Sequence, residues 1–392
     1  MGCKLEAPEQ TKRVLRVDVS ASRVAQEIDR LSEYYGKRTT VDGFRAGRVP
    51  SQVIRAKQLS KLQEEAIDRV IREAYREALE QCKLAPINIA EIDEIRFERE
   101  SMLSFRASFE VIPEIEIKHY KHLRGTRRMR QVKEHDVDSE LERLREASVV
   151  LKPVERAATL SDAVVADLRV FQGRQLVREV AESTVLVKNL VPELQNQMVG
   201  KMPGDRVTVE GDGKVTTISI REVKEPVYPQ VDDAFAKDVG FDNLTVLRDK
   251  IAGELERAED LRSQREVQDE IVNHLIEKNP FEAPASLVEA QLGQISSNKE
   301  EWEKYRTDAI FLVKRDIVLD KVAAAENMSV DEEELDQEIQ GIAESRNIPS
   351  QRLKNELKKS GRIDVLRESL KRRKALKFLV DNASIKTKNV KE

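Results

Sequence analysis

The sequence predicts an α+β protein of several domains, with a mixed α+β region first, a small β-rich region second and an elongated helical region last. Three observations support this prediction. The chain has 392 residues, more than one hydrophobic core ordinarily serves. Strand-like alternation and helical periodicity occupy different stretches of the chain. Charged residues make up 36% and aromatic residues only 4%, which favours long, charged helices over thin cores.

Residues 1–115 predict an α+β unit with the order strand, helix, helix, strand, strand. Residues 12–19 alternate Val or Leu with charged side chains, as a half-buried strand does. Ser20 or Ser22 is placed to cap a helix that ends near Gly36.

The second half of this unit contains two further helices and two strands. Pro50 suits the first turn of a short helix, and a longer helix with one apolar face extends from about Lys61 to Gln81. The segments "EIRFERE" and "SMLSFRASFEVI" predict two strands joined by a tight turn, because apolar and polar side chains alternate in them.

The segment "TTVDGFRAGRVPSQVI", Thr39 to Ile54, predicts a shaped loop between the first two helices. Gly43 and Gly47 permit backbone angles that are closed to other residues. The surrounding sequence is basic although the formal charge of the whole chain is −4. Asp42 is the single acid among seven basic residues, which are Lys37, Arg38, Arg45, Arg48, Arg55, Lys57 and Lys61.

An exposed phenylalanine among arginines has two interpretations. A hairpin-like turn would use the two glycines, but it would not need Phe44, Arg45 and Arg48 displayed together. An anchor on a nucleic-acid or ribonucleoprotein surface would, since arginines meet phosphates or acidic side chains while the ring fills a pocket. The residue chemistry alone leaves both interpretations open.

Residues 116–151 predict a connector. Its stretch "IKHYKHLRGTRRMRQVK", residues 117–133, has seven Lys or Arg and no acid, and an amphipathic helix starts at Asp136 and runs through Leu141 and Leu144. The positive charges could follow phosphates, but a flexible, solvated segment is the commoner meaning of such a run.

The sequence predicts no metal site and no cofactor. His119, His122 and His135 lie close together in the chain, but no cysteine and no third ligand at suitable spacing accompany them. Phosphate-loop, metalloprotease and nucleophile-elbow motifs are also absent from the sequence.

Residues 152–223 predict a small β-rich domain, with the strand-like runs "AVVADLRVF", "STVLVKN", "DRVTVEG" and "VTTISIREV". Met198 and Met202 are interpreted as gap-filling residues.

Residues 224–392 predict a helical domain. Ser329 and Glu332 form a capping-box pattern, and Trp302 and Phe311 are interpreted as packing residues. Breaks between helices are expected at Pro280, Pro284, Pro349 and Gly361.

Cysteine usage and hydropathy predict a cytoplasmic protein. Cys3 and Cys82 are the only cysteines, and their spacing suggests neither a metal site nor a disulfide framework. The N-terminus lacks the apolar run of a signal peptide, and no stretch of 18 consecutive apolar residues occurs.

The loop motif resembles that of a known family. The residues Gly43, Phe44, Arg45, Ala46, Gly47, Arg48, Val49 and Pro50 match the G-F-R-x-G-x-x-P loop of bacterial trigger factor. The stretch "FEVIPEIEI", Phe109 to Ile117, and "DDAFAKDVGFDNLTVLRDKI" near the start of the helical region are also similar to that family. The order of the four regions is similar over the whole chain.

This resemblance implies an ATP-independent chaperone that binds ribosomes. In that family the loop docks at the tunnel exit, on ribosomal RNA and a neighbouring ribosomal protein. The resemblance therefore implies that residues 43–50 bind the ribosome and that nascent or unfolded polypeptides are the clients. Residues 284–327 and 329–380 would form two arms, and 225–278 with the C-terminal segment the body. No membrane partner is expected, and a homodimer is compatible with the resemblance.

The middle domain departs from the family's FKBP-like pattern. Prolyl isomerases of that type bind proline in a pocket walled by aromatics, but Phe171 is the single aromatic between Lys152 and Val223. The family's V/I-P-G-F-E run is replaced by Val191-Pro192-Glu193-Leu194-Gln195, and the loop before the last strand is shortened to "EGDGK". We therefore expect a degenerate domain without catalytic residues. Two alternatives stay open: an active prolyl isomerase, and an RNA-binding ribosome assembly factor.

Overall fold

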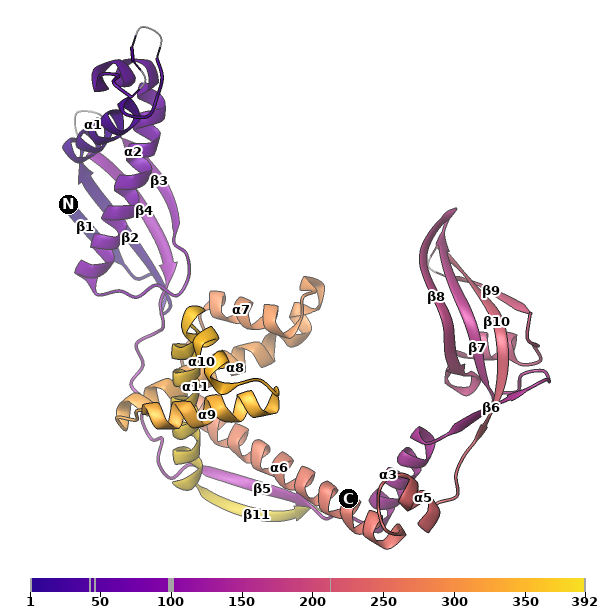
Figure 1. Ribbon diagram of the computed structural model, residues 1–392. Coiled ribbons are helices and arrows are strands. Elements are labelled where there is room, and N and C mark those ends of the chain that lie inside the picture. Colours follow the sequence, from indigo (N-terminus) through magenta and orange to yellow (C-terminus); the bar gives the residue numbers. More distant parts are fainter. Residues whose placement is uncertain (1, 42–43, 46, 98–101, 212, 391–392) are drawn as a thin grey trace. The chain divides into compact units, whose positions relative to one another are not determined.

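The structure is a computed structural model of the whole chain (Figure 1). It describes residues 2–41, 44–45, 47–97, 102–211 and 213–390. Contacts between residues divide the chain into two compact units. One unit comprises Met1–Arg127 with Arg265–Thr387, and the other comprises Arg128–Gln264 with Lys388–Glu392.

An antiparallel sheet and two helices form the N-terminal region (Figure 1). The sheet has the order β1-β2-β4-β3. Apolar side chains of β2, β4 and the two helices bury one another in a single core, with Leu15, Phe109 and Ala74 among the most buried. The elements are β1 (Gly2–Glu6), β2 (Lys12–Ser20), α1 (Ala21–Gly36), α2 (Ser51–Cys82), β3 (Glu91–Phe97) and β4 (Met102–Glu110).

The expected strand and helix order is confirmed here, with three differences. β1 was not expected, because five residues with two charges among them give little periodic signal. The two helices after the loop form one helix, α2, with a kink at Gln58, where φ is −132°. Ser20 occupies the N-cap position of α1, but its hydroxyl bonds to that of Ser22 and not to a backbone N–H. The expected turn after β3 lies outside the described residues.

The connector is an ordered part of the fold, so the expectation of a flexible segment is wrong. Its strand β5 (Arg124–Arg130) pairs with a C-terminal strand, β11 (Ser384–Val390), and its helix is α3 (Glu134–Ala147). Leu123, beside β5, is buried in the core of the helical region. The apolar face of α3 buries Val137 and Leu141.

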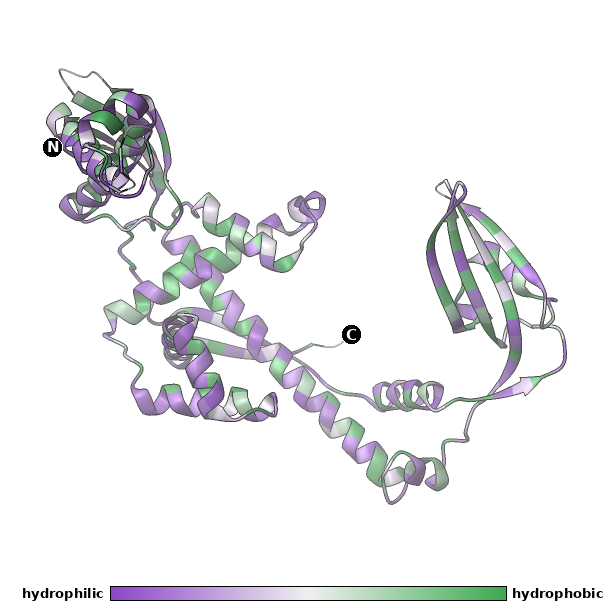
Figure 2. Cartoon of the chain, turned by 45° about the horizontal axis from the view of Figure 1, so that its top comes forward, coloured by the Kyte–Doolittle hydropathy of each residue, from purple (hydrophilic) through white to green (hydrophobic). Residues whose placement is uncertain are grey.

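The middle region is an antiparallel sheet with the order β6-β10-β7-β8 and with β9 paired to β10. Hydrophobic and hydrophilic residues alternate along its long strands (Figure 2), which gives the sheet one core-facing side. The elements are β6 (Val150–Val154), β7 (Ala163–Gln172), β8 (Gln175–Leu186), η1 (Val187–Asn189), α4 (Pro192–Met198), β9 (Arg206–Gly211) and β10 (Lys214–Val227). Met198 fills this core as expected, whereas Met202 is exposed.

Helices make up most of the remaining chain. Their bounds are α5 (Asp233–Asp238), α6 (Leu244–Lys278), α7 (Ala285–Ile295), η2 (Lys299–Glu301), α8 (Trp302–Ala325), α9 (Glu332–Ser345), α10 (Ser350–Lys359) and α11 (Arg362–Asp381). The expected breaks at the three prolines and Gly361 are confirmed, because each lies outside these helices. Trp302 and Phe311 pack against the core, as expected.

Two details of the helical region differ from the sequence-based prediction. The capping box of α9 is formed by Asp331 and Glu334, not by Ser329 and Glu332. Asp331 accepts from the backbone N–H of Glu334 at 2.8 Å, and a carboxylate gains more than a hydroxyl from the positive end of a helix. The region is also not purely helical, because β11 ends it.

The prediction of an α+β fold of several domains, with a helical C-terminal region, is confirmed. No helix in the described ranges is both long enough and apolar enough to cross a membrane.

Candidate functional site: the loop between α1 and α2

The loop leaves α1 at Gly36 and reaches α2 at Ser51, and backbone hydrogen bonds fix both of its ends. The N–H of Thr39 donates to the carbonyl of Tyr35 at 2.9 Å, which prolongs the turn beyond α1. The N–H of Val49 donates to the carbonyl of Gly36 at 3.2 Å, which joins the two ends of the loop. The loop tip is therefore displayed from a closed base.

Two glycines at this base are required by geometry. A Cβ atom at Gly36 would lie 2.5 Å from the carbonyl oxygen of Val49, closer than real Cβ atoms come to backbone. Gly47 has a φ of +75°, the left-handed region predicted for it, and a Cβ there would lie 3.2 Å from the carbonyl oxygen of Lys37. The sequence predicted only that a helix ends near Gly36, because no local pattern reveals the close approach of this residue to Val49.

We expect Gly36→Ala to separate the two ends of the loop, because the added Cβ cannot avoid the Val49 carbonyl. The variant should lose about 1–3 kcal/mol of stability, as strain at tightly packed sites does. The free energy of unfolding is measured by chemical denaturation, followed by far-UV circular dichroism. Gly253→Ala is the matched control, because a Cβ there meets nothing within 4 Å; equal losses in both variants would contradict the assigned contact.

The predicted site residues fall into two groups. Val49 is buried together with Val41 in the N-terminal core, so it holds the loop in place. Phe44, Arg45 and Arg48 are exposed, with 40% of the phenylalanine accessible to solvent. Pro50 is the exposed N-cap residue of α2, one position before the first turn in which it was expected. Gly43 and Ala46 lie outside the described residues.

The basic residues near the loop differ in the contacts that their charged groups make. Arg55 donates to the carboxylate of Asp29 at 2.6 Å, so its charge is partly offset. The guanidinium of Arg38 lies 4.0 Å from the ring centre of Tyr34, which is itself exposed. Tyr34 was not singled out in the sequence, although an aromatic residue shortly before a basic loop is a usable signal. A shallow hollow of about 330 Å³ lies at the base of the loop, between Lys37 and Arg48.

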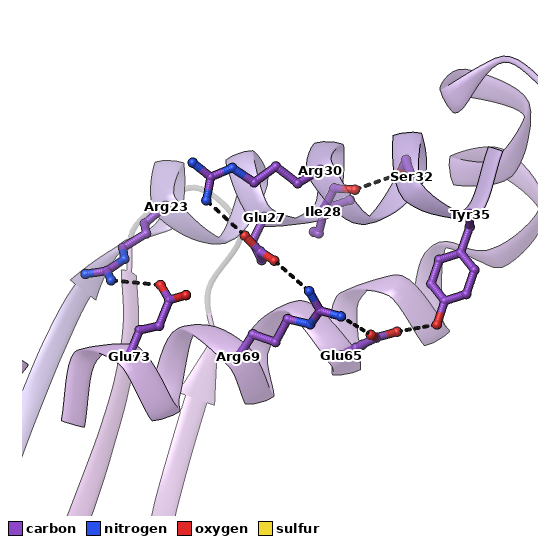
Figure 3. A network of polar contacts seen from close by, with 9 residues as sticks. All are labelled: Arg23, Glu27, Ile28, Arg30, Ser32, Tyr35, Glu65, Arg69 and Glu73. Atoms are coloured by element: carbon purple, nitrogen blue, oxygen red, sulfur yellow. Dashed lines mark hydrogen bonds and ion pairs between the residues drawn. The ribbon is translucent and has the colours of Figure 1, made fainter. Parts of the chain in front are cut away.

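A polar network holds α1 against α2 beneath the loop (Figure 3). The hydroxyl of Tyr35 donates to Glu65 at 2.8 Å, and Arg69 donates to the same carboxylate at 2.8 Å. Arg69 also reaches Glu27 at 3.4 Å. Because Tyr35 comes from the last turn of α1, this network fixes the direction in which the loop leaves the helix.

A second ion pair closes the other end of the two helices. Arg23 donates to both oxygens of Glu77, at 2.7 and 2.8 Å. This hydrogen bond lowers the pKa of Glu77 below its ordinary value. The hydrogen bond that Tyr35 donates to Glu65 has the opposite effect on its donor and raises the pKa of Tyr35. These contacts therefore help to hold α1 against α2.

The described core of the middle region does not contain the aromatic side chains that would wall a proline-binding pocket. Its core contains aliphatic side chains and Met198, and no aromatic ring among its described residues. Phe171 is half-buried at the far end of β7, where it pairs with Leu176 of β8 and Val215 of β10. The ring of Tyr228 lies 5.4 Å from the Arg145 guanidinium and 5.8 Å from the Lys188 ammonium, so it serves as a cation–π partner.

The described residues also contain no group of three or more His, Cys, Asp or Glu that could hold a metal ion. Nδ1 of His274 is hydrogen-bonded to the carbonyl of Arg124, the first residue of β5.

Comparisons with known proteins agree with the family that the loop motif indicates. Models of the N-terminal and C-terminal regions of bacterial trigger factor match residues 1–144 and 243–381. Trigger factors of Halothermothrix orenii and Bacillus subtilis are each 28% identical to this chain over 97% of its length, covering 99% and 100% of those proteins.

A solved structure of a trigger factor chaperone, described as showing promiscuous substrate recognition in folding and assembly, is similar in fold. Its TM-score is 0.51 at 23% identity, and the match covers 97% of this chain and 99% of the other. Since both terminal models and the relatives agree over nearly the full length, the chain belongs to the trigger factor family.

Proposed function

We infer that this protein is an ATP-independent, ribosome-associated chaperone that binds nascent polypeptides at the tunnel exit and delays their misfolding. The observation that carries this inference is the G-F-R-x-G-x-x-P loop of a trigger factor family member, held with Phe44, Arg45 and Arg48 exposed. A hydrogen-bonded base with exposed aromatic and basic side chains suits docking on RNA and protein together.

The ribosome-binding residues within this proposal are Gly43, Phe44, Arg45, Ala46, Gly47, Arg48, Val49 and Pro50. The exposed side chains make the contacts, whereas Gly47 and Val49 shape and anchor the loop. Neutralising phosphates releases counterions, so binding should weaken steeply with added salt.

The helical region supplies the client-binding surface in this proposal, with α7 and α8 in one arm and α9 to α11 in the other. Buried side chains of α7 to α11 are divided between two cores, one around Leu292 and Val318 and one around Leu335 and Ile339. Apolar residues such as Ile295 and Val365 remain exposed between charged ones. Such scattered apolar contacts hold an unfolded chain weakly, without a dense surface that would itself aggregate.

The chaperone function has a direct test. We expect the full chain, at a few-fold molar excess and without nucleotide, to delay aggregation of a chemically unfolded client followed by light scattering. Adding ATP should change nothing. A folded protein, verified by circular dichroism, that leaves the aggregation rate unchanged would contradict the proposal.

We expect negligible prolyl isomerase activity from the middle region. Lowering a barrier of about 18–20 kcal/mol requires a shaped apolar pocket that favours the twisted amide. The aliphatic core and the position of Tyr228 offer little for such a pocket. An NMR exchange assay on an X-Pro peptide measures this, and acceleration well above background that disappears in Phe171→Ala would contradict the expectation.

The RNA-binding alternative is less favoured by the connector's contacts. Arg130 pairs with Asp136, and Arg127 and Arg128 also have partners within the chain. Arginine side chains that already have partners within the protein are less available to bind phosphates. Co-sedimentation with ribosomes, compared with binding to free RNA of equal concentration, separates the two functions.

A further inference from the structure

The two cysteines of the chain face each other across the N-terminal region. Cys3 is in β1 and Cys82 is the last residue of α2, yet their sulfur atoms are 3.7 Å apart. They are separated by 79 positions in the sequence, which contains no other cysteine. Both are free thiols, half-buried, and pack against the margin of the N-terminal core.

We propose that Cys3 and Cys82 form a redox-modification site that closes to an intramolecular disulfide when the protein meets a peroxide. No role of these residues in ribosome binding or client binding is involved, so the proposal is independent of the proposed function.

The local structure permits the closure. A disulfide bond is about 2.05 Å long, so each sulfur must move by roughly one ångström from its present position. Among the described residues β1 is an edge strand that pairs with β2, with Cys3 opposite Val17. Cys82 is followed by Lys83, whose left-handed backbone ends α2. Both cysteines thus lie at the ends of elements, where small shifts disturb few hydrogen bonds.

The chemistry balances with a peroxide as the two-electron oxidant. One thiolate attacks a peroxide oxygen, the O–O bond breaks, and the products are a sulfenic acid and, after proton uptake, water. The sulfur of the second cysteine then attacks the sulfenic sulfur, forming the S–S bond and expelling hydroxide, which takes up a proton. Two thiols lose two electrons in total, and one peroxide becomes two waters. A dithiol reductant reverses the change by exchange.

Burial and the neighbouring Cys82 sulfur raise the pKa of Cys3 to about 11. The protonated thiol therefore predominates at neutral pH, and thiols react with peroxide only as thiolates. Cys3 should accordingly react slowly with peroxide, so an excess of peroxide is used to test closure of the pair.

The disulfide would also stabilise the region that carries the loop. It would link two residues that are 79 positions apart, which restricts the unfolded chain. The link lies at the end of α2 opposite the loop, since the loop joins α2 at Ser51 and Cys82 ends it. Stabilisation should thus leave the exposed loop residues in place.

The test uses the full chain treated with excess hydrogen peroxide, followed by thiol counting under denaturing conditions and non-reducing peptide mapping. We expect both thiols to disappear together, the peptides of Cys3 and Cys82 to be linked, and dithiothreitol to restore both. The oxidised protein should show a thermal transition raised by about 5 °C or more.

Cys3→Ser and Cys82→Ser are the control variants, and each should retain one thiol that gives no internal link and no rise in Tm. Covalent dimers in place of the internal link, addition of oxygen atoms to either cysteine without linkage, or two thiols that survive excess peroxide would each overturn the proposal. Because the main readout uses the unaltered chain, it holds even if a serine variant fails to fold.

Discussion

The double substitution Phe44→Ala with Arg45→Ala is expected to abolish co-sedimentation with ribosomes while the fold remains intact. An aromatic anchor at the centre of an interface typically contributes about 2 kcal/mol or more, and a charged contact adds to it, so affinity should fall by roughly 100-fold or more. Both side chains are exposed, so little packing is lost. Sedimentation through a sucrose cushion at several salt concentrations measures the loss.

A matched control exists on the same region of the chain. Ile95 and Arg96 in β3 are also an adjacent exposed apolar and basic pair, and Ile95 is 48% exposed. The variant Ile95→Ala with Arg96→Ala should bind ribosomes as the unaltered protein does. Equal binding by the two double variants would remove the anchor role of the loop.

The second large effect is expected in the middle region, from Arg156→Met. Arg156 donates to the carboxylate of Asp162 at 2.5 and 3.0 Å, and Asp162 is only 1% exposed. The backbone N–H and hydroxyl of Thr159 also donate to this carboxylate, both at 2.8 Å. Removal of the guanidinium leaves a buried charge without its counter-charge, which typically costs about 3–5 kcal/mol. Urea unfolding of the full chain, followed for the middle region by hydrogen exchange, measures this loss.

The pH dependence of this variant provides a sharper test. Burial raises the pKa of Asp162, but the Arg156 guanidinium and the Thr159 hydrogen bonds outweigh it and leave the pKa below its ordinary value of 3.8. A carboxylate with a lowered folded pKa stabilises the fold above its ordinary pKa, and this stability is lost as the pH falls through the folded pKa. The difference between the unaltered protein and Arg156→Met should therefore be largest near neutral pH and shrink below about pH 4.

Arg169→Met is the matched control for this prediction. Arg169 donates to Glu179 at 2.7 Å on the same sheet, but both side chains are about half exposed. Exposed pairs typically contribute about 0–1 kcal/mol, so the loss should be small and nearly independent of pH. A loss as large as that of Arg156→Met would show that burial of Asp162 is not the cause.

Local patterns in the sequence determined much of this protein. The alternation in residues 12–19 is enough to predict β2, and prolines and glycine mark where helices end, because these signals lie within a few residues. The loop motif likewise indicated the family and the exposed Phe44, because its glycines and arginines all lie in one short stretch of sequence.

Only the tertiary structure decided which distant segments meet. The basic connector became a strand because β11, more than 250 positions away, pairs with it, and neither strand has a hydrophobic pattern of its own. The close approaches of Gly36 to Val49 and of Cys3 to Cys82 likewise depend on how the whole chain folds. Periodicity defines the buried face of each element, whereas the partner of that face is chosen by packing of the whole chain, which no local window of sequence contains.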